Sequence, residues 1–438
     1  DARLQRLTEE ALRNQLAALD AREVRDAAAI VLDNASGDVL AYVGSAGPHS
    51  TAAAVDGAAA LRQAGSTLKP FLYGLAIERR LLTAASLLED SPLDLETGAG
   101  LYIPQNYDHA FRGPVSVRAA LAGSLNVPAV RTLALVGLEP FRERLQALGY
   151  RRGLTESGEY YGFALALGSP EVTLLEQANA YRTLANRGLW SPLRLRAGDP
   201  QAAPRRVIDA GAASIVADIL ADNGARAASF GLGSPLATPF WSAAKTGTSK
   251  NMRDNWCIGF TARHTVAVWV GNFEGDPMRN SSGITGAAPA WLDIVTRLPA
   301  PPAAAPAPAD GIVRVGIRYA GGEEPPRTEW FLGGTEQAEI RRIDAASARP
   351  RIAAPADGLI AALDPDIPAA HQHLIFDARH ARDASWRLDG SLIGPARMRQ
   401  LWTPSPGRHH LELVSADGTT LDAVRFEVRA AAAAGADR

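Results

Sequence analysis

Strand-forming segments lie at both ends of the first 300 residues and enclose a long stretch with a helical pattern. Near the amino terminus, apolar runs at 28–32 and 39–43 flank the turn signal Asn34-Ala35-Ser36-Gly37-Asp38, which favours a β-hairpin. Alanine and leucine recur at helical spacing from about 55 to 230. Strand signals then return at 241–246, 255–261 and 265–271. This order predicts an α+β domain, with one antiparallel sheet built from both ends and a helical subdomain inserted.

The chain changes character after residue 298. Pro299 to Pro308 is a Pro/Ala tract that predicts a semi-rigid linker. Further on, short alternating runs are separated by Asp-Gly pairs at 357, 389 and 417, a spacing typical of a small Ig-like β-sandwich. We therefore expect a helical linker segment at 1–26, a main domain at 27–298, a linker and β-rich connector at 299–348, a sandwich at 349–430 and a disordered tail at 431–438.

Several classes of function are excluded by composition. A net charge of −2 provides no basic field for nucleic acid, and no nucleic-acid-binding signature is present. The single cysteine, Cys257, rules out an intrachain disulfide. No phosphate loop or ordered set of metal ligands appears, so we expect no cofactor and no metal. The chain opens at Asp1 within a helical pattern, without an initiator Met, and we interpret it as a fragment of a longer protein.

Lysine is nearly absent from the chain. Of its 45 basic residues, all but Lys69, Lys245 and Lys250 are arginine. Arginine stays protonated at biological pH, whereas a desolvated lysine can lose its proton and act as a base. A sequence with so few lysines draws attention to the places where it retains them.

Two of these lysines belong to a set of three short motifs. The set comprises Ser66-Thr67-Leu68-Lys69, Ser124-Leu125-Asn126 and Lys245-Thr246-Gly247, in the order S-x-x-K, S-x-N and K-T-G. Pro70 is compatible only with the first turn of a helix, so a helix must begin close to Ser66. Residues three apart share a helix face, and Lys69 is therefore expected to reach back to the hydroxyl of Ser66.

A second S-x-x-K match, Ser242-Ala243-Ala244-Lys245, lies in a predicted strand. Residues three apart on a strand point to opposite faces, so we reject Ser242 as the nucleophile.

These residue types suggest a division of roles. Ser66 is the expected nucleophile and Lys69 its general base, which requires the pKa of Lys69 to fall by roughly three units from about 10.4. Ser124 is expected to relay a proton to the leaving amine, Asn126 to hold a substrate carbonyl, and Lys245 to supply positive charge. Thr246, Gly247 and Thr248 are expected to bind substrate. The backbone N–H groups of Ser66 and Thr248 are the expected oxyanion hole.

Longer segments around the motifs resemble the transpeptidase domain of bacterial class A penicillin-binding proteins. The similar segments are 64–71 around the nucleophile, 115–130 around S-x-N, 174–188, and 254–271 after K-T-G. From about Arg349, with Pro355-Ala356-Asp357-Gly358, the chain resembles the accessory sandwich of the penicillin-binding protein 1C type. The resemblance implies a penicillin-binding/β-lactamase-like fold in the main domain.

The resemblance also implies a function. It implies a D,D-transpeptidase that cross-links peptidoglycan stem peptides through a serine acyl-enzyme and is acylated by β-lactam antibiotics. A glycosyltransferase domain and a membrane anchor would precede residue 1, which places the whole protein at the periplasmic face of the bacterial inner membrane. Two alternatives stay open: a hydrolase (a D,D-carboxypeptidase or a β-lactamase), and a non-catalytic scaffold whose sandwich recruits an envelope protein.

Overall fold

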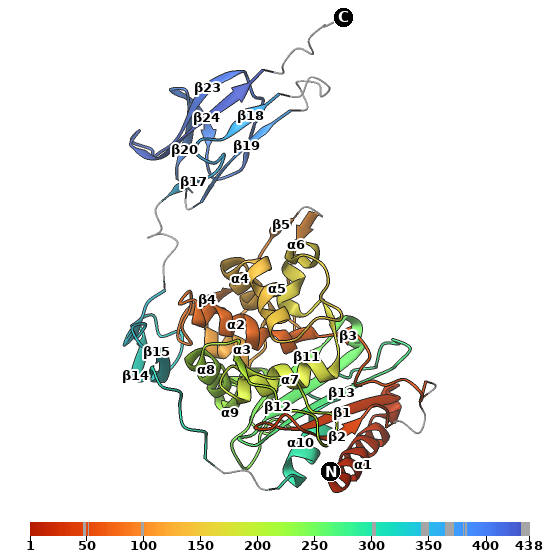
Figure 1. Ribbon diagram of the computed structural model, residues 1–438. Helices are drawn as coiled ribbons and strands as arrows, with labels where there is room; N and C mark the ends of the chain where they lie inside the picture. Colours follow the sequence, from red (N-terminus) through yellow and green to blue (C-terminus); the bar gives the residue numbers. More distant parts are fainter. Residues whose placement is uncertain are drawn as a thin grey trace, which may run out of the picture. The chain divides into compact units, whose positions relative to one another are not determined.

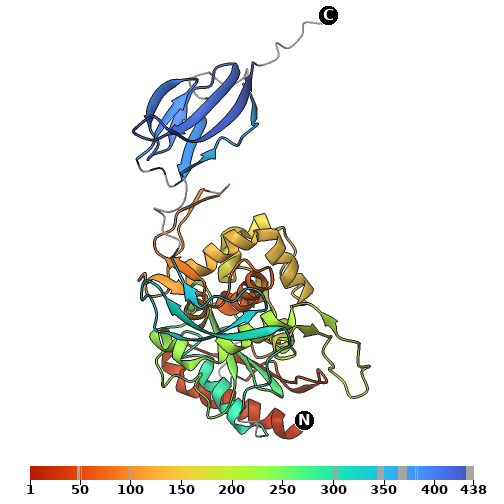
Figure 2. The same cartoon turned by 90° about the vertical axis from the view of Figure 1, so that its left-hand side faces the viewer.

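The computed structural model describes residues 1–430 except 47–49, 51, 98–99, 300–303, 343–349, 364–371, 380 and 382. The chain divides into two units, residues 1–341 and residues 342–438 (Figures 1 and 2). The predicted tail at 431–438 lies outside the described residues, as do residues 300–303 of the predicted linker and 343–348 of the predicted connector.

The core of the first unit is a five-stranded sheet in the order β11-β12-β13-β1-β2. Its strands come from both ends of the unit, as the sequence predicts, and all four pairings are antiparallel. Asp26 of β1 pairs with Gly271 of β13, and Asp33 with His264. The bounds are β1 Asp26–Asp33, β2 Val39–Val43, β11 Ala243–Thr248, β12 Asp254–Phe260 and β13 His264–Gly271.

Helices cover both faces of this sheet (Figure 1). Helices α1 (Ala2–Ala18) and α10 (Ala288–Arg297) pack on one face, and α7 (Leu174–Ala185) and α8 (Ala210–Ala221) on the other. Ala28, Ile30 and Leu32 of β1 join the core under α7, whereas its alternate residues join the core under α1. Burial on both sides explains why β1 reads as a continuous apolar run rather than an alternating one.

The remaining helices of this unit build the inserted helical region. Helix α2 runs through its centre, with Phe71 in edge contact with the rings of Tyr150 and Tyr181. The α-helices are α2 Lys69–Glu78, α3 Val117–Ala122, α4 Asn126–Val136, α5 Leu138–Ala147, α6 Gly158–Tyr161 and α9 Asn223–Phe230. Two 3-10 turns, η2 Gly65–Leu68 and η3 Gly162–Leu167, belong to this region, whereas η1 Asp20–Arg22 precedes β1 and η4 Lys250–Met252 lies between β11 and β12.

Four two-stranded ribbons join these helices, pairing β3 with β8, β4 with β7, β5 with β6, and β9 with β10. Their bounds are β3 Arg62–Gln63, β4 Leu87–Asp90, β5 Leu95–Thr97, β6 Gly100–Tyr102, β7 Gly113–Ser116, β8 Glu171–Val172, β9 Leu189–Trp190 and β10 Arg205–Arg206.

Two segments that the sequence analysis set apart belong to the first unit. Helix α1 ends at Ala18 and packs on β2 and α10, so it is part of the fold rather than a linker segment. The connector forms a sheet in the order β15-β14-β16, and β15 contacts α8. Its bounds are β14 Ile312–Tyr319, β15 Arg327–Leu332 and β16 Glu339–Ile340. Tyr319 and Phe331 bury against Ala85, a long-range contact that local patterning does not encode.

The second unit is a small β-sandwich, as the sequence predicts. One sheet has the order β17-β19-β22 and the other β18-β24-β23-β20-β21. Phe376, Trp386, Leu411, Leu413 and Phe426 lie in the core between them. The bounds are β17 Arg351–Ala354, β18 Ile360–Ala362, β19 Leu374–Arg379, β20 Ser385–Leu388, β21 Ser391–Pro395, β22 Gln400–Trp402, β23 Gly407–Val414 and β24 Thr420–Arg429.

None of the helices in the described part of the chain combines the length and the apolar character that a bilayer crossing requires. No group of three or more His, Cys, Asp or Glu side chains in this part of the chain is arranged to hold a metal ion.

Candidate active site

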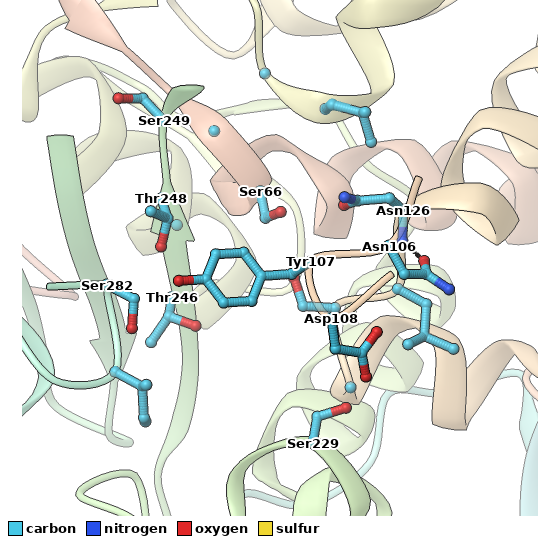
Figure 3. A pocket seen from close by; sticks show the side chains of 18 of the residues that line it. Ser66, Asn106, Tyr107, Asp108, Asn126, Ser229, Thr246, Thr248, Ser249 and Ser282 are labelled. Carbon is cyan, nitrogen blue, oxygen red and sulfur yellow. Dashed lines mark hydrogen bonds between the residues drawn. The ribbon is translucent and has the colours of Figure 1, made fainter. Parts of the chain in front are cut away.

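Ser66 lies at the start of the central helix, on the wall of a cleft of about 590 Å³ (Figure 3). It occupies the 3-10 turn η2, which leads directly into α2 at Lys69, with Pro70 in the first helical turn. Gly65 has a positive φ of 57°, a conformation that suits glycine and turns the chain into the helix. The expected start of a helix at Ser66 is thus realised as a 3-10 turn.

The amine of Lys69 is fully buried and points at the S-x-N segment. It donates to the carbonyl oxygens of Ser124 at 2.7 Å and Leu125 at 3.1 Å, and to Oδ1 of Asn126 at 2.6 Å. Burial, with added repulsion from Lys245, holds the pKa of Lys69 well below its usual value. Among the partners of this amine in the described part of the chain, the Ser66 hydroxyl, which the sequence predicts, is missing.

Ser124 links the second motif to the third. Its Oγ accepts a hydrogen bond of 2.7 Å from Nζ of Lys245, so S-x-N and K-T-G meet at this atom. Its φ of 60° lies in the left-handed region, which costs a residue other than glycine about 1–3 kcal/mol. Strain of this kind persists where the surrounding structure imposes it. Here Lys245 donates to the hydroxyl of Ser124 and Lys69 to its carbonyl oxygen.

Lys245 projects from β11, the edge strand of the central sheet. Burial, followed by repulsion from Arg226, lowers the pKa of its amine to about 7. Ser242 of the rejected motif instead places its hydroxyl 2.8 Å from that of Thr238. Ser242 lies immediately before β11, which begins at Ala243, so the expectation that Ser242 is a strand residue is wrong by one position.

At the floor of the cleft, glycine residues let the backbones of the nucleophile turn, of Gly168 and of β11 approach each other closely. A Cβ on Gly65 would lie 2.7 Å from the carbonyl oxygen of Thr248, and one on Gly168 would overlap the carbonyl oxygen of Gly65. A Cβ on Gly247 would lie 2.7 Å from Cγ2 of Thr67. These contacts hold the nucleophile turn against β11. A Cβ on Gly65 would also lie 3.0 Å from the backbone nitrogen of Thr248, so the Ser66 turn and Thr248 lie side by side.

Hydroxyl groups line the wall formed by β11. Thr246, Gly247 and Thr248 all border the cleft, and Oγ1 of Thr248 accepts a hydrogen bond of 3.0 Å from the N–H of Gly283. In the view of Figure 3, the ring of Tyr107 lies between this wall and the side of the cleft that carries Asn126.

Sequence reasoning missed Asn106. Its Oδ1 accepts from the N–H of Asn126 at 2.8 Å, and its Nδ2 donates to both carboxylate oxygens of Asp90, at 2.8 and 2.9 Å. Asn106 thereby fixes the start of α4 and with it the S-x-N turn. Asn126 is also tied to this loop, because its Nδ2 donates to the carbonyl of Gln105 at 2.8 Å. A lone asparagine in a loop carries no periodic signal that would single it out.

Comparison with known proteins agrees with this geometry. Residues 27–295 match the model of the penicillin binding protein transpeptidase domain, and residues 339–426 match that of the penicillin-binding protein C-terminus family. Penicillin-binding protein 1C of Escherichia coli K12 is 37% identical over 291 residues, which cover 66% of this chain and 36% of the relative. Penicillin-binding protein 1B of Vibrio cholerae is 32% identical over 301 residues, which cover 64% and 37% respectively.

Solved structures give the same picture. The crystal structure of penicillin-binding protein 1A from Haemophilus influenzae aligns with a TM-score of 0.63 at 25% identity, over 72% of this chain and 54% of that chain. The present chain spans little more than a third of the two curated relatives that it matches. The transpeptidase match covers more than half of the chain and contains all three motifs, so the chain belongs to the penicillin-binding protein transpeptidase domain family.

Proposed function

We propose that the first unit is a serine D,D-transpeptidase that cross-links peptidoglycan stem peptides and is acylated by penicillins. The observation that carries the proposal is the meeting of three motifs at one cleft. A buried lysine with a depressed pKa adjoins the serine turn, and a second lysine is bonded to the S-x-N serine. In this family the set serves acyl transfer through a covalent serine intermediate.

Acylation follows from these positions. Ser66 Oγ attacks the carbonyl carbon of the penultimate D-alanine while neutral Lys69 takes the hydroxyl proton. The N–H groups of Ser66 and Thr248 stabilise the developing oxyanion, which is typically worth about 3 kcal/mol for each donor. As the C–N bond breaks, Ser124 gives its proton to the leaving nitrogen, and Lys245 replaces that proton. The second hydrogen on Nδ2 of Asn126 is directed at a substrate carbonyl, and the hydroxyls of Thr246 and Thr248 at the substrate carboxylate.

The fate of the acyl-enzyme separates a transpeptidase from a hydrolase. A hydrolase needs a positioned base to activate water. Among the described residues that line the cleft, Asp108 is the one carboxylate. It accepts hydrogen bonds from Arg112 at 2.6 Å and from the N–H of Ala110 at 3.2 Å. The ion pair with Arg112 lowers the pKa of Asp108, which makes it a poor base. This arrangement favours transfer to an amine on a neighbouring stem over hydrolysis.

The setting of the whole protein is part of the proposal. Penicillin-binding proteins act on the cell wall outside the cytoplasmic membrane, and we propose that this unit works at the periplasmic face of the inner membrane. We further propose that the complete protein also polymerises glycan through a domain preceding residue 1.

We also propose that the second unit binds an envelope protein. Its sandwich exposes apolar side chains, with Leu392 and Met398 both 70% exposed. Replacing both with serine should abolish capture of a partner by residues 1–438, whereas capture that is unchanged would contradict this surface as the binding site.

The first experiment incubates the protein with a penicillin and follows its intact mass for hours beside Ser66→Ala. A stable adduct of one drug molecule, absent from the variant, is the expected result. Consumption of the drug through a short-lived adduct would show that the first unit is a hydrolase and not a transpeptidase. No adduct from either protein would favour the scaffold.

A further inference from the structure

Arg226 is a buried arginine close to the site. It lies on α9 (Asn223–Phe230) and is 3% exposed. Its Nε donates to the carbonyl of Asp222 at 3.3 Å and its Nη2 to the carbonyl of Leu220, while Nη1 has no partner among the described residues. The carboxylate of Asp222 is itself bound to Arg118 at 3.0 Å and caps α9 through the N–H of Ala225. The guanidinium is therefore buried without a carboxylate bonded to it.

The same side chain adjoins the K-T-G lysine. Arg226 and Lys245 line one small cavity, which leaves no room for a water molecule. Phe230 and Thr246 border both this cavity and the cleft, so the cavity lies directly behind the β11 wall. Water cannot screen the two cations here, and repulsion between like charges is stronger in such a medium than in solvent.

A purely structural role accounts for part of this arrangement. The carbonyls of Leu220 and Asp222 lie at the carboxyl end of α8, where a basic side chain caps a helix favourably. Such capping explains the hydrogen bonds that Nε and Nη2 make. It does not explain why Nη1 lacks a partner or why the charge borders Lys245, since an exposed arginine could cap the same helix end.

We propose that Arg226 is a positioning residue that acts through Lys245: its fixed charge makes the Lys245 ammonium a stronger acid and so promotes proton transfer through Ser124 to the leaving nitrogen. This inference rests on the proposed acyl transfer for its purpose, but its physical basis can be tested without any reaction. Protons balance in the step, because Ser66 gives one to Lys69, Lys245 gives one to Ser124, and Ser124 gives one to the leaving nitrogen.

Burial and the charged and titratable groups around Lys245 together lower the pKa of its amine. Arg226 on α9 repels an ammonium at this position, and Lys69 on α2 does so once it has taken up the Ser66 proton. Cys257 on β12 would favour the ammonium only as a thiolate, and burial raises the pKa of that thiol. Asp222 acts on Arg226, whose guanidinium stays charged at any biological pH. Of these neighbours, Arg226 is the one whose charge does not depend on pH.

The chain offers an unusually clean test, because it contains three lysines. Lysine carrying ¹³C at Cε gives three resonances, which single Lys→Arg variants assign and whose shifts report protonation. The Lys245 resonance should titrate near pH 7 in the native protein. In Arg226→Gln and Arg226→Met the midpoint should move up by about one unit.

Arg182 supplies the matched control. It is 2% exposed and donates to the carbonyls of Asn34 and Ser191, far along the chain from Lys245. Arg182→Gln removes a buried arginine of the same kind and should leave the Lys245 midpoint unchanged. The Met variant removes the unpartnered charge while filling its volume, so it provides a folded test if Gln disrupts α9.

Two outcomes would overturn the inference: a Lys245 midpoint that does not move when Arg226 loses its charge, or one that moves equally in Arg182→Gln. The penicillin acylation rate is measured against pH in the same variants, and the limb set by Lys245 should move with the resonance. If no variant is acylated but the resonance still moves, the tuning stands and the proposed acyl transfer fails.

Discussion

Two sets of buried cations in residues 1–341 are built in opposite ways. Lys69, Lys245 and Arg226 donate to carbonyl, amide and hydroxyl oxygens, and the described residues offer them no ion pair. Arg118 instead forms ion pairs with Asp218, Asp222 and Glu329. Glu329 also binds Arg327, which pairs with Glu324; we call these six residues the Arg118 cluster.

The two sets respond oppositely to burial. Burial would lower the pKa of Arg118, but its hydrogen bond to Glu329 and the nearby carboxylates outweigh burial and raise it. No such compensation reaches Lys69 or Lys245, whose pKa values fall. A paired cation holds elements together, here α3, α8 and β15, whereas an unpaired lysine can exchange a proton. We therefore expect that changes at Lys69, Lys245 and Arg226 alter the acylation rate, whereas changes in the Arg118 cluster alter the free energy of unfolding.

The largest effect is expected for Lys69→Arg. Arginine fills the site with a cation that cannot act as a base, so penicillin acylation should fall by up to about 10⁴-fold with the fold retained. The measurement is the second-order rate of labelling by a fluorescent penicillin. Lys250→Arg makes the same chemical change at an exposed position and should stay within a few-fold of the native rate. Native-like acylation by Lys69→Arg would remove Lys69 as the base.

Arg118→Met should show the converse pattern. Removing the cation leaves buried Glu329 and its neighbours without their main partner, which should destabilise the first unit by about 3–5 kcal/mol. Thermal unfolding of this unit measures the loss, while the acylation rate per folded molecule should change by less than tenfold. A large loss of acylation rate with native stability would show that Arg118 acts on the chemistry and not on the stability of the unit.

The pH dependence of stability distinguishes the unpaired lysines from the ion-paired Arg118. Folded Lys245 releases its proton near pH 7, whereas an unfolded lysine keeps it to about 10.4, so the unfolded chain binds more protons in between. The free energy of unfolding should therefore rise with pH, by up to about 1.4 kcal/mol per unit for each such lysine. The window is pH 7 to about 8.5, above which an unfolded Cys257 begins to ionise and opposes the trend.

Lys245→Met should flatten this slope, since it removes one of the two titrating lysines. Arg118→Met should leave the slope unchanged while lowering the whole curve. Chemical unfolding at closely spaced pH values distinguishes the two, and equal slopes in the native protein and Lys245→Met would contradict a depressed pKa at Lys245.

The smallest effect is expected at the sandwich. Arg387 and Glu412 form a two-pronged ion pair with both distances at 2.8 Å, on the face of β20 and β23 that solvent reaches. The pair is half-buried but faces away from the core of the sandwich, and ion pairs on a solvated face contribute little. Arg387→Ala should therefore cost less than about 1 kcal/mol in unfolding of the second unit. A loss as large as that of Arg118→Met would mean that pairing, and not burial, sets the size of the effect.

Sequence patterning predicted the parts of the molecule that local periodicity encodes. The hairpin of β1 and β2 and the strands β11 to β13 follow from apolar runs and turn residues. The motif order predicted that Ser66, Lys69, Ser124, Asn126 and Lys245 would meet. In the structure hydrogen bonds join the last four, and Ser66 lines the same cleft as Ser124 and Asn126. The roles assigned to them stay predictions until the variants are measured.

Contacts between distant segments escaped the same reasoning. Asn106 lies in a loop and Arg226 on a short helix. The partner of Asn106 is Asn126, 20 residues away along the chain, and that of Arg226 is Lys245, 19 residues away. The expected contact of Lys69 with Ser66 follows from helix spacing alone. Spacing could not reveal that three acceptors at 124–126 would compete for the amine. The strands of the connector follow from its alternating pattern, but its packing on the first unit does not, because Glu329 meets Arg118 only in the folded chain.

The glycine floor of the cleft has an evolutionary consequence. At Gly65, Gly168 and Gly247, the smallest possible side chain would collide with backbone or with Thr67, so these positions cannot change without moving the nucleophile. Adaptation to a new antibiotic would therefore have to arise at the rim, where Tyr107, Ser229 and Ile284 border the cleft through their side chains. Resistance in such a protein should map to residues that the chemistry does not use.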